Sequence, residues 1–159
     1  MDELLKLLEK NSSRKPSQIA DMLGVSEDVV HDKIKAFEND GTILGYGAIL
    51  NEDRVDSGLV RAVIEVKLTP ERDGGFDRVA ERIAKHSEVK SCYLMSGAYD
   101  LLVIIEDDDL KKVASFVSEK LSTIDGVVST STHFMLKTYK FHNILMKQEH
   151  NEERLAVSP

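Results

Sequence analysis

The first 44 residues carry their hydrophobic positions at helical spacing, in three short runs. This spacing predicts one helix over 1–10, a second over 16–23, and a third that Ser26 caps and Gly41 ends. The inward stripe of the third helix consists of Val30, Ile34 and Phe37, which recur at i, i+4 and i+7. The N-terminal segment is therefore expected to be a small bundle of three helices.

The residues that follow lose the helical period. Residues 42–50 have strand character, interrupted by Gly45 and Gly47, and residues 51–59 are polar with one further glycine. We predict a short strand in the first stretch and a linker between two domains in the second.

From residue 60 onward the hydrophobic positions alternate with polar ones, which is typical of β-strands. Strands are predicted over 60–69, 89–95, 101–106 and 127–140, and amphipathic helices over 76–86 and 110–121. The strand over 101–106 is almost wholly apolar, as expected in the middle of a sheet. The order βαββαβ predicts an α+β, ferredoxin-like domain, a four-stranded antiparallel sheet with two helices on one face.

The other face of this sheet needs a cover, and the region offers no third helix for it. A second copy of the chain is the simplest cover, so we predict self-association through the sheet. The segment 143–159 is mostly polar, and we predict nothing for it beyond one candidate strand over 141–146. The organisation is thus a domain over 1–50, a linker over 51–59, a second domain over 60–142 and a polar tail over 143–159.

Composition and charge narrow the class of protein. The chain has 159 residues, of which 42% are hydrophobic and 31% charged, which is typical of a folded globular protein. Cys92 is the single cysteine, and no apolar run reaches the roughly 18–20 residues of a membrane span. The start of the chain carries acids and lysines, unlike a signal peptide, and we expect a cytoplasmic protein. The net charge of −7 argues against a purely electrostatic grip on nucleic acid.

Nothing in the sequence specifies catalysis. The five histidines are spread singly without metal-ligand spacing, and no nucleophile elbow, phosphate-binding loop or dinucleotide fingerprint is present. Cys92 reads as a small packed residue of a strand, and the acidic run 107–109 as a turn that caps the next helix. We expect no catalytic residues, no metal and no cofactor.

Two helices joined by a glycine-containing turn within a three-helix bundle form a helix-turn-helix, whose last helix enters the major groove of double-stranded DNA. The outward face of that helix is centred on Asp28, Asp32 and Lys35, and carboxylates can accept a hydrogen bond from cytosine. The candidate DNA contacts are Arg14, Lys15, Ser26, His31, Lys33 and Lys35. The alternative is a helical bundle used only for protein contacts.

The chain resembles the Lrp/AsnC family of prokaryotic transcription regulators, the feast/famine regulators, over about 1–142. The residues that carry the resemblance are Ile19-Ala20-Asp21-Met22-Leu23-Gly24-Val25-Ser26, Phe37-Glu38-Asn39-Asp40-Gly41, Ile43-Leu44-Gly45-Tyr46, Val89-Lys90-Ser91 and Ser96-Gly97-Ala98-Tyr99-Asp100-Leu101-Leu102. The resemblance implies a winged-type helix-turn-helix, joined by a strand-bearing linker to a ligand-sensing βαββαβ domain. It also implies dimers that pair through their sheets, often assembled into octamers, with small effectors, usually amino acids, between dimers.

The resemblance also implies where an effector binds. The family's Thr/Ser-Gly-x-Tyr-Asp loop contributes to that site, and here it consists of Ser96, Gly97, Ala98, Tyr99 and Asp100. Backbone N–H groups at such a glycine can hold a carboxylate, and an aspartate can pair with an ammonium group. Further hydroxyl contacts could come from Thr130, Ser131 and Thr132 on the last strand. The alternative is a tight turn with glycine at positive φ.

The predicted function is a sequence-specific, DNA-binding transcription regulator that responds to an amino acid or related metabolite. One departure from the family pattern supports an alternative: the recognition helix carries Glu27, Asp28 and Asp32 where the family has Arg or Lys. The chain could then be an effector-binding, oligomeric partner protein that has lost DNA binding. A siroheme-decarboxylase-like enzyme is a distant third reading, because such an active site needs basic and histidine residues around its tetrapyrrole and this sensing half is slightly acidic.

Overall fold

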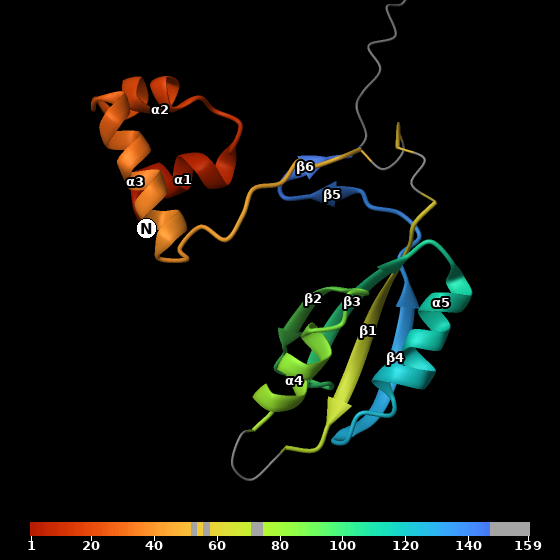
Figure 1. Cartoon of the computed structure of the whole chain (residues 1–159). Coiled ribbons are helices and arrows are strands. Elements are labelled where there is room, and N and C mark those ends of the chain that lie inside the picture. The colour runs from red at the N-terminus through yellow and green to blue at the C-terminus, as the bar shows by residue number, and fades with distance from the viewer. Residues whose placement is uncertain (52–53, 56–57, 71–74, 147–159) are drawn as a thin grey trace, which may run out of the picture. The chain divides into compact units, whose positions relative to one another are not determined.

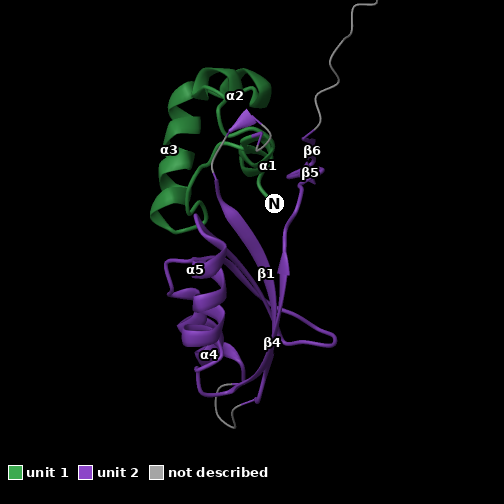
Figure 2. Ribbon diagram, turned by 90° about the vertical axis from the view of Figure 1, so that its right-hand side faces the viewer, with its two compact units in different colours: residues 1–50 green, residues 51–159 purple. Residues whose placement is uncertain are grey.

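The structure, a computed structural model, describes residues 1–51, 54–55, 58–70 and 75–146 (Figure 1). It contains two compact units, Met1–Leu50 and Asn51–Pro159, which we call unit 1 and unit 2 (Figure 2). Within the described part of the chain, no helix is both long and apolar enough to cross a membrane.

Unit 1 is a bundle of three helices, as predicted: α1 (Glu3–Lys10), α2 (Pro16–Leu23) and α3 (Glu27–Asn39). Each helix contributes to one small core, which consists of Leu4, Leu8, Ile19, Ala20 and Val30. The carboxylate of Asp2 accepts a hydrogen bond from the Leu4 N–H, 2.8 Å away, and caps α1.

The short strand predicted over 42–50 is wrong. No strand is present in this stretch, although Ile43 is tied to the end of α3 by a 2.8 Å hydrogen bond from its N–H to the Phe37 carbonyl. A strand needs a neighbour to pair with its N–H and C=O groups, and none of the described strands pairs with these residues. All residues from Leu44 to Leu50 are exposed.

Unit 2 contains the predicted βαββαβ order. Its elements are β1 (Val60–Leu68), α4 (Asp77–Ala84), β2 (Val89–Leu94), β3 (Leu101–Asp107), α5 (Leu110–Ser115), η2 (Phe116–Leu121) and β4 (Val127–Phe134). The strands form one antiparallel sheet in the order β2-β3-β1-β4. The almost wholly apolar strand β3 lies in its interior, as predicted, and α4 and α5 cover one face (Figure 2).

The core of unit 2 lies between this face and the helices. Alternate residues of β1 and β3 point into it, together with apolar residues of α4, α5 and η2: Ala62, Ile64, Val66, Leu68, Val79, Ile83, Leu101, Val103, Ile105, Val113, Phe116, Leu121 and Ile124. Cys92 packs against this core as predicted for a small residue, and its burial raises the pKa of the thiol.

Two elements of unit 2 differ from their predicted form. The helix over 110–121 is α-helical only to Ser115 and then widens into the π-helical turn η2. This turn buries Phe116 and Leu121, whose separation of five residues would turn them about 140° apart on a regular α-helix. The strand predicted over 127–140 ends at Phe134, which pairs with Ala62 of β1; one further hydrogen bond, 2.9 Å from the Met135 N–H to the Arg61 carbonyl, follows it.

A two-stranded hairpin, β5 (Lys140–Phe141) and β6 (Ile144–Leu145), follows the sheet and turns at His142 and Asn143, both at positive φ. It accounts for the candidate strand over 141–146; of the predicted polar tail, 147–159 lies outside the described residues.

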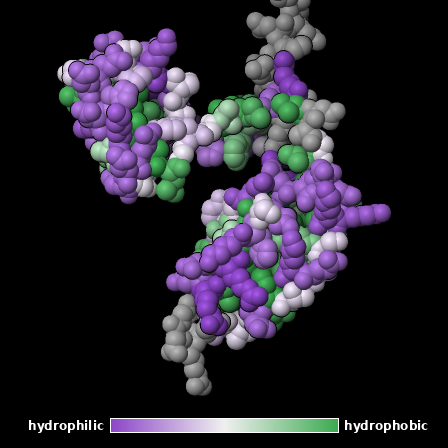
Figure 3. Space-filling model, viewed as in Figure 1, coloured by the Kyte–Doolittle hydropathy of each residue, from purple (hydrophilic) through white to green (hydrophobic). Residues whose placement is uncertain are grey.

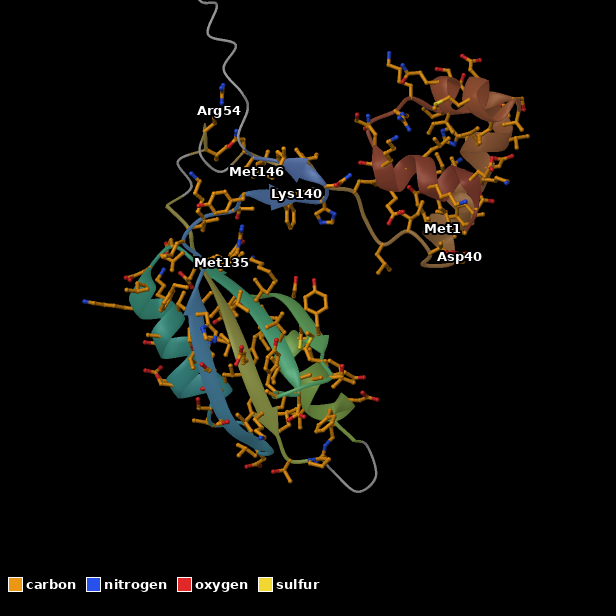
Figure 4. All side chains as sticks on the ribbon, turned by 180° about the vertical axis from the view of Figure 1, so that it is seen from behind. Met1, Asp40, Arg54, Met135, Lys140 and Met146 are labelled. Carbon is orange, nitrogen blue, oxygen red and sulfur yellow. The ribbon has the colours of Figure 1, made fainter. Side chains whose placement is uncertain are left out.

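Among the described residues of unit 2, no helix lies on the second face of the sheet (Figure 4, seen from behind). Its centre is apolar and consists of Val63, Leu102 and Ile104, which the strand register places side by side. The ion pair of Arg61 with Glu106 lies on the same face, and the Glu65 carboxylate lies 3.6 Å from the His133 ring there.

Candidate DNA-binding helix and effector loop

The turn between α2 and α3 has the geometry of a helix-turn-helix. Gly24 adopts the left-handed conformation at φ 66°, and the Val25 N–H donates to the Ala20 carbonyl, 3.1 Å away. A residue with a Cβ is strained in this conformation, so the glycine allows the chain to leave α2 and enter α3 at once. Ser26 is the N-cap residue as predicted, but its side chain makes no capping hydrogen bond, which leaves its hydroxyl available for another partner.

The inward and outward faces of α3 are as predicted. Val30 is buried, and Ile34 and Phe37 are partly buried against the core of unit 1. The opposite face exposes Asp28, His31, Asp32 and Lys35 to solvent. The face that could enter a DNA groove is thus a mixture of two acids, a histidine and a lysine.

The four candidate phosphate contacts are not equivalent. The Lys33 ammonium lies 3.2 Å from the Asp2 carboxylate, and the Arg14 guanidinium donates to the Leu7 carbonyl at 3.3 Å. The bond from the Leu4 N–H, and after it Lys33, lowers the pKa of Asp2. By contrast, the side chains of Lys15 and Lys35 have no ion pair within the described residues. Lys15 and Lys35 are therefore the cations most ready to meet a phosphate.

The loop 96–100 joins β2 to β3 and is anchored at its end. One Asp100 carboxylate oxygen accepts a 2.7 Å hydrogen bond from the Leu68 N–H, and the Asp100 N–H donates to the Val66 carbonyl at 3.0 Å. Ser96, Gly97 and Ala98 are exposed, with Gly97 at φ 142°. The loop thus has an open tip, and its aspartate holds the end of β1.

The three hydroxyl residues of β4 do not act together. Thr130 pairs with Val66 and Thr132 with Ile64, so both lie on the face that the helices cover. Ser131 pairs with Glu65 on the opposite face, where its hydroxyl lies 3.3 Å from the His133 ring. A single effector site on one sheet face cannot receive all three side chains, because successive residues of a strand point in opposite directions.

The anchoring role of Asp100 was not foreseen from the sequence, nor was the pairing of Glu65 with His133 across two strands. The alternation of β1 and β4 places both residues on one face, but only the register, which pairs Glu65 with Ser131, makes His133 its diagonal neighbour. Among the described residues, no group of three His, Cys, Asp or Glu side chains is arranged to hold a metal ion.

Comparisons with known proteins match both units. A family model described as winged helix-turn-helix DNA-binding matches residues 3–43, and one described as Lrp/AsnC ligand binding domain matches residues 61–145. These matches and the fold define a transcriptional regulator that joins a DNA-binding helix-turn-helix to a ligand-binding domain. The chain belongs to the Lrp/AsnC family.

Individual relatives agree with this assignment. Over 99% of its length the chain is 45% identical to YugG of Bacillus subtilis, named an uncharacterized HTH-type transcriptional regulator, and covers 95% of it. It is 31% identical to the HTH-type transcriptional regulator LrpA of Pyrococcus abyssi, with 86% of this chain and 94% of that one covered. A transcriptional regulator of Neisseria meningitidis, solved as a complex with L-Met, has a TM-score of 0.68 at 25% identity, with 89% and 93% covered.

Proposed function

We propose that this regulator binds operator DNA through residues 1–50 and an amino acid through residues 60–142, with 51–59 as the linker. The observation that carries the proposal is the exposed face of α3, which follows directly on the left-handed turn at Gly24. Lys35 and His31 are proposed to meet the groove, with Ser26 and Lys15 on phosphates. Lys33 and Arg14 are secondary contacts, since both are already engaged within unit 1.

We propose that the amino acid binds at the tip of the loop 96–100. The exposed backbone around Gly97 suits a carboxylate, and the second oxygen of Asp100 remains for an ammonium group. The Neisseria relative, solved with L-Met, supports an amino acid as the effector of this chain. The proposal assigns the protein a binding role and no catalysis, and a place of action in the cytoplasm, where its DNA target lies.

The open sheet face is proposed to pair with that of a second copy. Val63, Leu102 and Ile104 form an apolar centre of the kind found within oligomer interfaces, and polar side chains, among them the pair of Arg61 and Glu106, lie around it. Dimers formed this way could assemble further into octamers. Several helix-turn-helix units in one assembly would strengthen weak DNA contacts through effective concentration. This gain would offset the repulsion between DNA and a chain whose net charge is −7.

The test is binding of the full chain to DNA from upstream of its own gene, across a salt series, with and without the twenty amino acids. Lys35→Ala is expected to weaken binding and to lower the slope of log K against log salt by about one. Lys33→Ala is the matched control, since it removes the same charge from the same helix. Unlike Lys35, Lys33 is already paired with Asp2. Equal effects of both variants would remove Lys35 as a specific contact.

A second candidate function rests on the two exposed carboxylates of α3. Asp28 and Asp32 would repel DNA phosphates, so the chain could act as an effector-binding partner of other proteins. Absence of DNA binding even at low salt, together with retained amino-acid binding, would favour this function over the first.

A further inference from the structure

A cleft in unit 2 is lined by residues that belong neither to the effector loop nor to the open face of the sheet. It has a volume of about 400 Å³ and runs between α4 and the turn that precedes β4. Val79 and Ile124, both core residues, form its apolar base. Figure 3 shows strongly hydrophilic residues gathered over α4.

The walls of this cleft are mainly cationic. Arg78 and Arg82 of α4 line it together with Lys85, the C-cap residue of this helix, and their spacing of i, i+4 and i+7 places them on one side. Glu81 and Asp125 are the two acids in the lining, so three cations meet two carboxylates. The cleft is locally positive in a chain whose net charge is −7.

Arg82 lies four residues after Arg78 and three before Lys85, with Glu81 beside it in the lining. Like charges three and four residues apart repel each other on a helix surface. Four other basic side chains of the described part of the chain are paired with acids: Lys33 with Asp2, Arg61 with Glu106, Lys112 with Asp108 and Lys120 with Glu88. Arg82 and Lys85 make no hydrogen bond or ion pair with any described side chain, although Glu81 and Asp125 also line the cavity, so both cations can turn to a bound anion.

We propose that this cleft binds a small metabolite through an anionic head group, a carboxylate or a phosphate. The planar fork of an arginine such as Arg82 matches two oxygens of either group, and the Lys85 ammonium adds a point charge. The apolar base of Val79 and Ile124 would contact the body of the molecule. All the lining residues belong to one chain, and none of them belongs to the loop 96–100.

The test is titration of the full chain with inorganic phosphate and, separately, with succinate, at constant ionic strength in chloride. Binding is followed by NMR shifts of the arginine Nε–H groups and by calorimetry. Saturable binding is expected with at least one anion, with a shift of the Arg82 signal. Phosphate alone would indicate a phosphate ester, and succinate alone a carboxylate.

Arg82→Gln is expected to weaken this binding about tenfold, because it removes a charge-assisted contact. Lys111→Gln is the matched control, since it removes one positive charge from an exposed position of α5 away from the cleft. Both variants should keep the circular dichroism of the parent. The proposal is overturned if neither anion binds saturably, or if both variants lose affinity equally, since the effect would then be one of net charge.

Discussion

The side chain of Asp100 is assigned two roles: it holds the end of β1 by a hydrogen bond, and it is proposed to bind the ammonium group of an effector. Replacing Asp100 by Ala or by Asn separates these roles. Its carboxylate accepts a 2.7 Å hydrogen bond from the Leu68 N–H at a partly buried position, beyond the last β1–β3 pair. A hydrogen bond to a charged acceptor contributes about 1.5–3 kcal/mol, and an N–H left without a partner adds to the cost of removing it. Asp100→Ala should therefore lower the free energy of unfolding by about 2 kcal/mol and the Tm by about 10 °C.

Asp100→Asn keeps an oxygen at the same place and should cost less than about 1 kcal/mol, while it removes the charge that would hold an ammonium group. The assay is urea unfolding followed by far-UV circular dichroism at one fixed protomer concentration, together with calorimetric titration of amino acids. Glu119→Ala, which removes an exposed carboxylate from η2, is the control and should change stability little. If Asp100→Ala were as stable as the parent, or if Asp100→Asn were equally destabilised, the hydrogen bond would not hold β1 as described.

Three further predictions follow from other parts of the chain. Lys120 lowers the pKa of Glu88 from 4.5 to about 2. This pair therefore stabilises the fold above pH 4.5, and its contribution is lost as the pH falls towards 2. In unfolding experiments, Glu88→Gln should cost up to about 1 kcal/mol at pH 7 and nothing near pH 2. Gly24→Ala should cost about 1 kcal/mol through its φ of 66° alone, since no atom lies within 4 Å of the added Cβ, whereas Gly45→Ala should be neutral by thermal unfolding. Ile104→Glu should break self-association, and a scattering mass that stays above the 17.8 kDa of one chain would contradict the proposed interface.

The sequence was sufficient where one element depends on one pattern. The stripe of Val30, Ile34 and Phe37 predicted α3 and its exposed face, and the alternation from Val60 to Leu68 predicted β1 and its buried side. Both depend on local periodicity, which tertiary contacts leave unchanged.

The sequence was insufficient where the end of an element depends on a distant partner. Residues 127–140 have the composition of one long strand, yet β4 ends at Phe134, where its pairing with β1 ends. For the same reason the strand character of residues 42–50 is not realised within a single chain. The hydrogen bond between Asp100 and Leu68 joins residues 32 positions apart, and no local pattern indicates it.

The π-helical turn η2 has a consequence for how chains of this fold are aligned. A wide turn holds one residue more than an α-helical turn, and here the extra residue lets both Phe116 and Leu121 reach the core. A homologous chain that is one residue shorter between these positions would close the turn into a regular α-helix without shifting β4. Alignment gaps of a single residue are therefore expected inside this helix, where gaps are normally penalised, and placing them in the neighbouring loop would misassign the residues that line the core.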